Sequence, residues 1–411
     1  MNNKKNYSTF SDIQGAERLT IDAVQKITDI VEDMHHTITS LGGLLGARNQ
    51  QRTTGITKMA YQGVHTVSGF VGNGFDALLD QLSLMIQKKE SSPGREAMMS
   101  TLNGVLGDYL VKKENPLAIP MQLRRDARPI LMGAPTLFES IQQSNKKIVL
   151  MVHGSCMNDL QWNRQGHNHG TALKNDFELF PIFLHYNTGR HISENGRELA
   201  NLLEAFVKHL PWSIELIIIA HSMGGLVSRS ACYYGDLAQH TWLNHLKKLI
   251  FLGTPHHGAL LEKSGNWVDI LLEANPYSAP FAKLGKLRSS GLTDLRYGNI
   301  LDEDWKGRDK FKYSWDKRKA VPLPGNVQCY TIAATAGKKP GRINDDLIGD
   351  GLVTLNSALG RNKNPDLNLV FPESHQWIGR NMNHVDLLSH PDVYKTIKKF
   401  AKNFIGTNFK D

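Results

Sequence analysis

The sequence predicts an α/β protein with a mostly parallel, doubly wound sheet. Three short, continuous apolar runs, at residues 148–152, 216–220 and 249–252, are each bounded by turn residues. Such runs are typical of strands buried on both faces of a parallel sheet. Segments with helical patterning separate them, over 195–210 and 224–236. The alternation of strand and helix favours a doubly wound sheet.

The first 112 residues are predicted to form an N-terminal helical region. Apolar residues recur at spacings of three and four, at Ile21, Val24, Ile27, Val31, Met34 and Ile38. A second amphipathic stretch covers residues 64–85, with an interruption at Gly72-Asn73-Gly74, and a third helix is expected over Glu96–Leu110. These helices are interpreted as a subdomain packed on the rest of the chain. The alternative is an interfacial helix layer near a lipid-facing mouth.

Residues 113–411 are predicted to form a second domain, which contains the sheet. Two further strands are expected, at Gln328–Ala334 and Leu367–Phe371. Between them and the earlier strands lies Leu260–Pro324, which is too long for a plain connection and is interpreted as a cap over the sheet edge, with a helix at Trp267–Glu273. Its aromatic residues either line an acyl site or simply pack the cap; they are Trp267, Tyr277, Phe281, Tyr297 and Trp305.

Composition excludes several classes of protein. The 48 Lys and Arg against 39 Asp and Glu give a net charge of +9, but the basic residues occur only in short runs, so no nucleic-acid partner is expected. The three cysteines, Cys156, Cys232 and Cys329, form no motif for a disulfide framework or a zinc site and fit a reducing compartment. Neither a secretory signal peptide nor a transmembrane segment is recognisable. We therefore expect a cytoplasmic protein, with peripheral contact to the inner face of the membrane as an open alternative.

The candidate nucleophile is Ser222, in the turn Ala220-His221-Ser222-Met223-Gly224-Gly225 between a predicted strand and a predicted helix. A nucleophile elbow holds its serine in a strained conformation at such a turn, and small residues two positions before and after it allow the strand and helix to approach. Ala220 and Gly224 meet this requirement. The alternative interpretation is a turn with a buried serine.

Two backbone amides are candidates for the oxyanion hole. In this architecture one amide comes from the residue after the nucleophile and one from the loop after an earlier strand. Met223 and Ser155 occupy these positions, the latter in His153-Gly154-Ser155-Cys156. His153 is interpreted as a residue that braces the loop rather than a catalytic one.

The acid and the base should follow Ser222 in the chain, on loops after later strands. Asp350 is the preferred acid because it is flanked by Gly349 and Gly351 after the strand at 328–334, with Asp345 and Asp346 as rivals. For the base, His384 follows the strand expected at 367–371 and is expected to open the last helix. His375 and His390 are the alternatives.

Four stretches make the chain similar to the lipase-type α/β-hydrolases, and most of all to the PGAP1-like group, named for a GPI inositol-deacylase, of bacterial type. They are Val152-His153-Gly154, Ala220–Gly225, Leu252-Gly253-Thr254-Pro255-His256-His257-Gly258 and Asp350-Gly351-Leu352-Val353. The resemblance covers roughly residues 115–400 and implies an α/β-hydrolase fold with Ser222 as nucleophile, Asp350 as acid and His384 as base. The elbow departs from the commonest pattern in having Ala220 for the first glycine.

The expected chemistry is acyl transfer to Ser222 followed by hydrolysis of the acyl-enzyme. This chemistry needs neither a metal nor an organic cofactor. The expected partner is an ester substrate, including lipid esters, which makes the chain a carboxylic-ester hydrolase of the lipase or esterase type. The alternatives are a thioesterase or acyltransferase on the same triad and a catalytically silent lipid- or protein-binding module.

Overall fold

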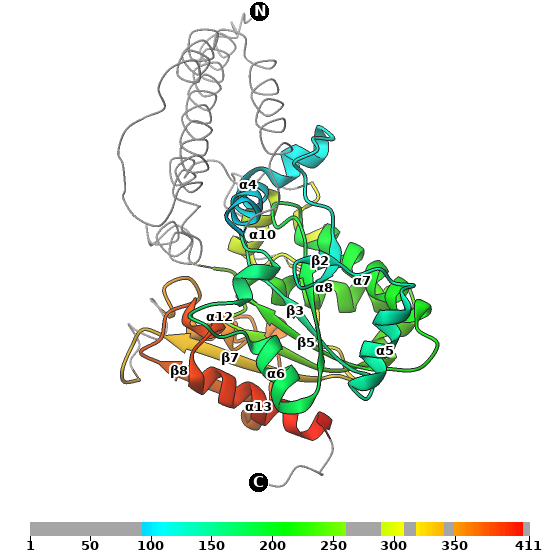
Figure 1. Ribbon diagram of the computed structural model, residues 1–411. Coiled ribbons are helices and arrows are strands. Elements are labelled where there is room, and N and C mark those ends of the chain that lie inside the picture. Colours follow the sequence, from blue (N-terminus) through cyan, green and yellow to red (C-terminus); the bar gives the residue numbers. More distant parts are fainter. Residues whose placement is uncertain (1–92, 260–288, 308–317, 341–348, 406–411) are drawn as a thin grey trace, which may run out of the picture.

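The computed structural model describes residues 93–259, 289–307, 318–340 and 349–405 (Figure 1). Within these ranges the chain forms an eight-stranded sheet with the order β2-β1-β4-β3-β5-β6-β7-β8. The strands are β1 (Gln122–Arg125), β2 (Arg128–Pro129), β3 (Lys147–Val152), β4 (Phe180–His185), β5 (Glu215–His221), β6 (Leu246–Leu252), β7 (Gln328–Thr335) and β8 (Gln376–Arg380). β1 pairs antiparallel with β2 and with β4, and every other pairing is parallel.

Helices flank this sheet on both faces. The α-helices are α4 (Pro93–Lys112), α5 (Pro135–Gln143), α6 (His169–Phe177), α7 (Ile192–His209), α8 (Met223–Leu237), α10 (Ser290–Tyr297), α11 (Asp302–Trp305), α12 (Leu355–Ala358) and α13 (Pro391–Ile405). Short 3₁₀ helices are η1 (Asp159–Trp162), η2 (Thr241–Asn244), η5 (Pro365–Leu367), η6 (Glu373–His375) and η7 (Asp386–Leu388). None of the described helices combines the length and the apolarity that crossing a membrane requires.

Side chains of the central strands alternate between two hydrophobic layers. Ile148, Leu150 and Val152 of β3 belong to the cluster that holds the buried residues of α7 and α8. Val149 and Met151 point to the opposite face, where α6 and α13 pack (Figure 1). Because both faces of these strands are buried, both sets of side chains are apolar, which is why the sequence shows continuous runs rather than alternation.

The predicted sheet is confirmed at the apolar runs and at 328–334, which correspond to β3, β5, β6 and β7. With eight strands, mostly parallel and flanked by helices, the architecture is an α/β-hydrolase fold. The strand expected at Leu367–Phe371 is wrong: Leu367 ends η5, and Leu369 and Phe371 are buried outside any strand. The last strand is instead Gln376–Arg380. His384 also does not open the last helix, which begins at Pro391.

The carboxyl ends of the parallel strands all lie at one edge of the sheet. The register pairs Val152 of β3 with Ala220 of β5, and His221 with Leu252 of β6. Leu252 is in turn paired with Ile332 of β7. The loops after these strands therefore meet, and they contain the predicted site residues. In doubly wound sheets this edge is where ligands bind.

The third predicted helix is confirmed as α4, and it packs against the loops at that edge. A Cβ added at Gly104 would lie 2.2 Å from Sγ of Cys156, which follows β3. One carboxylate oxygen of Asp108 accepts hydrogen bonds from the backbone N–H and the hydroxyl of Ser290, at 2.9 and 2.7 Å. α4 thus joins the loop after β3 to the start of α10 (Figure 1). The other two predicted N-terminal helices and the helix at 267–273 lie outside the described residues.

Candidate active site

Ser222 lies between β5 and α8 in a strained backbone conformation. Its φ of 54° and ψ of −125° are rare for a residue with a side chain, and such strain is concentrated at functional sites. The turn is held in place because the Ser222 N–H donates to the carbonyl of Leu252, at 2.8 Å. A Cβ added at Gly224 would lie 2.5 Å from the carbonyl oxygen of Val152. Position 224 therefore requires a small residue, as predicted, because α8 approaches β3 closely there.

The two predicted oxyanion amides come from elements that flank Ser222. Met223 is the first residue of α8, where a backbone N–H has no acceptor within the helix. Ser155 follows Gly154, and a Cβ added at Gly154 would lie 3.0 Å from Cβ of Ser222. The loop after β3 therefore lies directly beside the serine. The α8 N-terminus also favours negative charge there through the helix dipole.

The loop after β3 is braced on several sides. Cys156 has a φ of 58°, and its N–H donates to the Thr188 hydroxyl at 3.0 Å, so this amide already has an acceptor. The His153 ring stacks on Tyr186 with ring centroids 4.5 Å apart, and the Tyr186 hydroxyl donates to the His153 carbonyl at 2.9 Å. Burial lowers the pKa of His153 to about 3, so the ring is neutral. These contacts agree with the predicted bracing role.

Asp350 and His384 form a buried pair. Their Oδ2 and Nδ1 atoms are 2.7 Å apart, and both residues are at most 3% exposed. The other carboxylate oxygen, Oδ1, accepts from the N–H groups of Leu352 and Val353 at 3.0 and 2.8 Å. The His384 N–H also donates to the Asp350 carbonyl at 3.0 Å. The carboxylate is thus fixed by backbone amides on one side and by the imidazole on the other.

The His384 ring is packed against the elbow. Its centroid lies 4.7 Å from that of His221, the residue before Ser222, and a Cβ added at Gly253 would lie 3.1 Å from its Cε1. Nε2 is buried and has no hydrogen-bond partner among the described residues. No hydrogen bond joins it to Ser222, and apo sites often hold catalytic pairs at longer range.

His221 is a site residue that the sequence reasoning did not identify. Its Nε2 lies 3.3 Å from the carbonyl oxygen of His384, which requires a proton on Nε2. Burial, and then the neighbouring His384, hold the pKa of His221 well below its usual range, so the ring is a neutral donor. The only sequence signal was its position directly before the nucleophile. The contact ties the end of β5 to the loop that carries His384.

The rival residues lie elsewhere. His375 precedes β8, and its Nδ1 is 3.0 Å from the carbonyl of Cys329 near the start of β7, at the opposite edge of the sheet from Ser222. His390 is a half-exposed residue at the start of α13, beside Asp392. Asp345 and Asp346 lie outside the described residues.

Of the cap aromatics, Trp305 and Tyr297 are described. The Trp305 ring stacks on His191 at 3.5 Å, and its Nε1 donates to the Ser193 hydroxyl. This contact assigns Trp305 to packing against α7. Trp267, Tyr277 and Phe281 lie outside the described residues. Among the residues that the structure covers, no cluster of three or more His, Cys, Asp or Glu side chains could hold a metal ion.

Comparison with known proteins adds little detail. A family model described as a domain of unknown function (DUF7379) matches residues 131–284. No curated protein matches the chain. The chain is similar in structure to the mature lipase BlEst2 of Bacillus licheniformis, with 17% identity, 70% of this chain and 98% of that one covered, and a TM-score of 0.40. It is also similar to EstA of Clostridium botulinum, with 14% identity, 80% and 97% covered, and a TM-score of 0.36.

Proposed function

We propose that the chain is a serine hydrolase that cleaves carboxylic esters, with Ser222, His384 and Asp350 as its triad. The observation that carries the proposal is the buried Asp350–His384 pair, 2.7 Å apart, packed against His221, the residue before a strained serine between strand and helix. Such a constellation is recognised by its geometry and roles rather than by sequence position. The proposed catalytic unit comprises residues 113–411, with a cap at about 260–324 and the helical region 1–112 before it.

In the proposed mechanism His384 Nε2 removes the proton of the Ser222 hydroxyl as its oxygen attacks the ester carbonyl. Asp350 accepts a hydrogen bond from Nδ1–H, which leaves the lone pair on Nε2 and stabilises the imidazolium that forms. The imidazolium then protonates the alcohol that leaves. The same histidine then removes a proton from water as the water attacks the carbonyl of the acyl-enzyme. Breakdown of this second intermediate releases the carboxylic acid and restores the serine.

The backbone N–H groups of Met223 and Ser155 are proposed to bind the oxyanion of each tetrahedral intermediate. One such donor is typically worth about 3–4 kcal/mol of transition-state stabilisation. Because Ser155 would act through its main chain, Ser155→Ala should keep most of the activity. A variant that displaces the loop after β3 should lose most of the activity.

A fluorophosphonate probe tests the nucleophile, because it labels activated serines covalently. We expect labelling of the wild-type chain and none of Ser222→Ala. Ser228→Ala is the matched control, since Ser228 is also buried on α8 and its hydroxyl donates to the Gly224 carbonyl. Labelling that persists in Ser222→Ala would refute the assignment. Parallel assays with p-nitrophenyl esters and acyl-CoA would identify the acyl class, and turnover of acyl-CoA alone would replace the esterase proposal by a thioesterase.

A further inference from the structure

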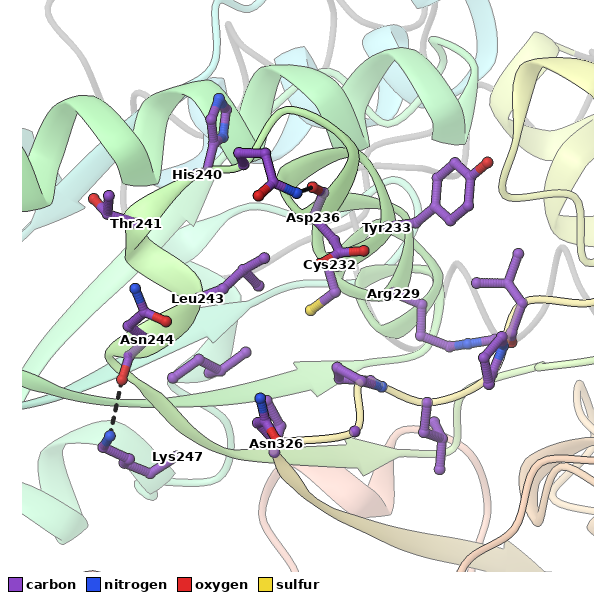
Figure 2. A pocket seen from close by; sticks show the side chains of 18 residues that line it. Arg229, Cys232, Tyr233, Asp236, His240, Thr241, Leu243, Asn244, Lys247 and Asn326 are labelled. Carbon is purple, nitrogen blue, oxygen red and sulfur yellow. Dashed lines mark hydrogen bonds between the residues drawn. The ribbon is translucent and has the colours of Figure 1, made fainter.

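A cavity lies at the amino ends of β6 and β7, and none of the proposed triad residues lines it. Its volume is about 620 Å³, within the range of small-molecule sites, which is about 300–1,000 Å³. It is open to solvent on one side and is lined by the second half of α8, by η2 and the start of β6, and by residues 321–327 before β7 (Figure 2). These are the amino ends of β6 and β7, whereas Ser222 follows the carboxyl end of β5. The proposed hydrolysis makes no use of this cavity.

The feature that marks the cavity is the buried guanidinium of Arg229 on α8. The residue is 6% exposed, and one of its terminal nitrogens donates to the carbonyl of Val321 at 2.7 Å. Among the described residues its buried Nε has no hydrogen-bond partner, and no carboxylate forms an ion pair with the guanidinium. Burial lowers the pKa of Arg229 to about 10, which still leaves it charged at neutral pH. A buried charge without a counter-ion is costly, so one is expected to bind.

The charged groups around Arg229 do not neutralise it. The Asp304 carboxylate is near enough to attract the guanidinium, but it already accepts the N–H groups of Ile300, Leu301 and Lys319. The Arg318 guanidinium, which donates to the carbonyls of His256 and Gly298, adds a second positive charge nearby. The local field therefore favours an anion.

The remaining walls suit an organic rather than an inorganic anion. The apolar side chains that line the cavity are those of Leu243, Leu246, Leu323 and Val327. Figure 2 shows Arg229 at one end of the cavity and Leu243 further along it, on η2. Exposed polar residues such as Asn244 and Asn326 form the rim. Asp236 and Lys247 also line the cavity, but both are exposed to solvent, which screens their charges. The buried guanidinium of Arg229 beside several apolar side chains is complementary to a monoanion with a short apolar chain.

We propose that this cavity binds an organic carboxylate with an aliphatic chain, its head on Arg229 and its chain along the wall of η2 and β6. A carboxylate matches the planar guanidinium and can accept two parallel hydrogen bonds from it. The site is separate from the proposed triad and does not depend on it. Binding at this site stabilises the folded chain around α8, because the ligand supplies the counter-ion that Arg229 lacks.

The test is calorimetric titration of the full chain with butanoate, hexanoate and octanoate. Since each methylene that reaches the apolar wall removes its area from water, affinity should rise about two- to fourfold per added carbon. Arg229→Met should weaken octanoate binding at least tenfold and leave the binding of 1-octanol unchanged. Arg128→Met on β2, an exposed arginine at the other end of the sheet, is the matched control and should bind as wild type does. Ser222→Ala should also bind normally.

Three results would overturn the proposal: equal affinity for all chain lengths, equal affinity for octanoate and octanol, or unchanged octanoate binding by Arg229→Met. Loss of binding in Ser222→Ala would move the site to the triad and overturn it too. If Arg229→Met does not fold, Leu323→Glu tests the same point. Leu323 is partly exposed on the cavity wall, so the carboxylate of the introduced glutamate would bind Arg229 in place of the ligand. Normal octanoate affinity in a folded Leu323→Glu variant would contradict the site.

Discussion

Replacing Asp350 by Asn should abolish most catalysis while leaving the fold intact. Asn has nearly the same shape, and its oxygen can still accept from the N–H groups of Leu352 and Val353, as Oδ1 of Asp350 does at 3.0 and 2.8 Å. Its amide nitrogen then faces His384 Nδ1. An N–H donor at that point forces the lone pair onto Nδ1 and the proton onto Nε2. The histidine can then no longer remove a proton from Ser222.

The size of the effect follows from the cost of restoring the productive tautomer. If the Asn side chain flips so that its oxygen faces His384, the two backbone N–H groups lose their acceptor. A buried donor without a partner costs about 1–3 kcal/mol, so two cost about 2–6 kcal/mol. At about 1.36 kcal/mol per tenfold change, kcat should fall by about 30- to 3 × 10⁴-fold. KM should change little, because Asp350 does not touch substrate in the proposed mechanism.

The assay is steady-state hydrolysis of a p-nitrophenyl ester, with thermal unfolding as the check on the fold. Asp386→Asn is the matched control: its carboxylate accepts the N–H of Asn383 in the same loop but does not contact the His384 ring. We expect the control to keep activity within a few-fold of wild type. If Asp350→Asn retains more than a tenth of wild-type kcat, or if the control loses as much as Asp350→Asn, the reasoning fails.

Three further predictions concern the base, the elbow and the response to acid. His384→Ala should lower kcat at least 10³-fold, whereas His375→Ala should remain active and lose only about 1 kcal/mol of unfolding free energy with its hydrogen bond, as measured by ester hydrolysis and urea titration. The opposite ranking in activity would exchange their roles. Gly224→Ala should lower the unfolding free energy by about 1–3 kcal/mol, because its Cβ would lie 2.5 Å from the Val152 carbonyl oxygen; an unchanged urea midpoint would contradict the packing. Burial lowers the pKa of His169 to about 3, so below pH 6.5 the unfolded chain binds a proton that the native chain does not. This residue alone should therefore lower the free energy of unfolding by about 1.4 kcal/mol per pH unit as the pH drops from 6.5 toward 3. In urea titrations, His169→Gln should lose less stability than the wild type between pH 6.5 and 5. An equal slope in both proteins would show that His169 is not the cause.

The parts of the sheet that the sequence predicts are those buried on both faces. β3, β5, β6 and β7 appear as continuous apolar runs because helices cover them on either side. β8 is an edge strand of mixed, half-buried residues and gives no such signal. Leu369 and Phe371 are apolar for another reason: they pack around Gly360, outside the sheet. β4 gives a weaker signal, because Pro181 in its second position interrupts the pattern of a central strand.

The candidate site likewise has residues with a sequence signal and residues without one. The candidate elbow at Ser222 is recognisable in the sequence because an elbow depends on its immediate neighbours, such as Gly224. The choice between His384 and His375 could not be made from chain order, since both follow the serine and the acid. It depends on the position of β8, because His375 precedes this strand and His384 follows it, so the two lie at opposite edges of the sheet. His221 escaped notice because its role, a neutral donor to the His384 carbonyl, exists only in the folded arrangement.

The packing of α4 changes how the chain divides into modules. The helical pattern of the first 112 residues predicts a boundary there, yet Gly104 lies against Cys156 and Asp108 binds Ser290 across that boundary. A chain shortened to begin at 113 would keep all eight strands but lose the helix that confines the loop beside Ser222. Any engineered unit that contains the sheet therefore has to include α4, because this helix supports the loop after β3.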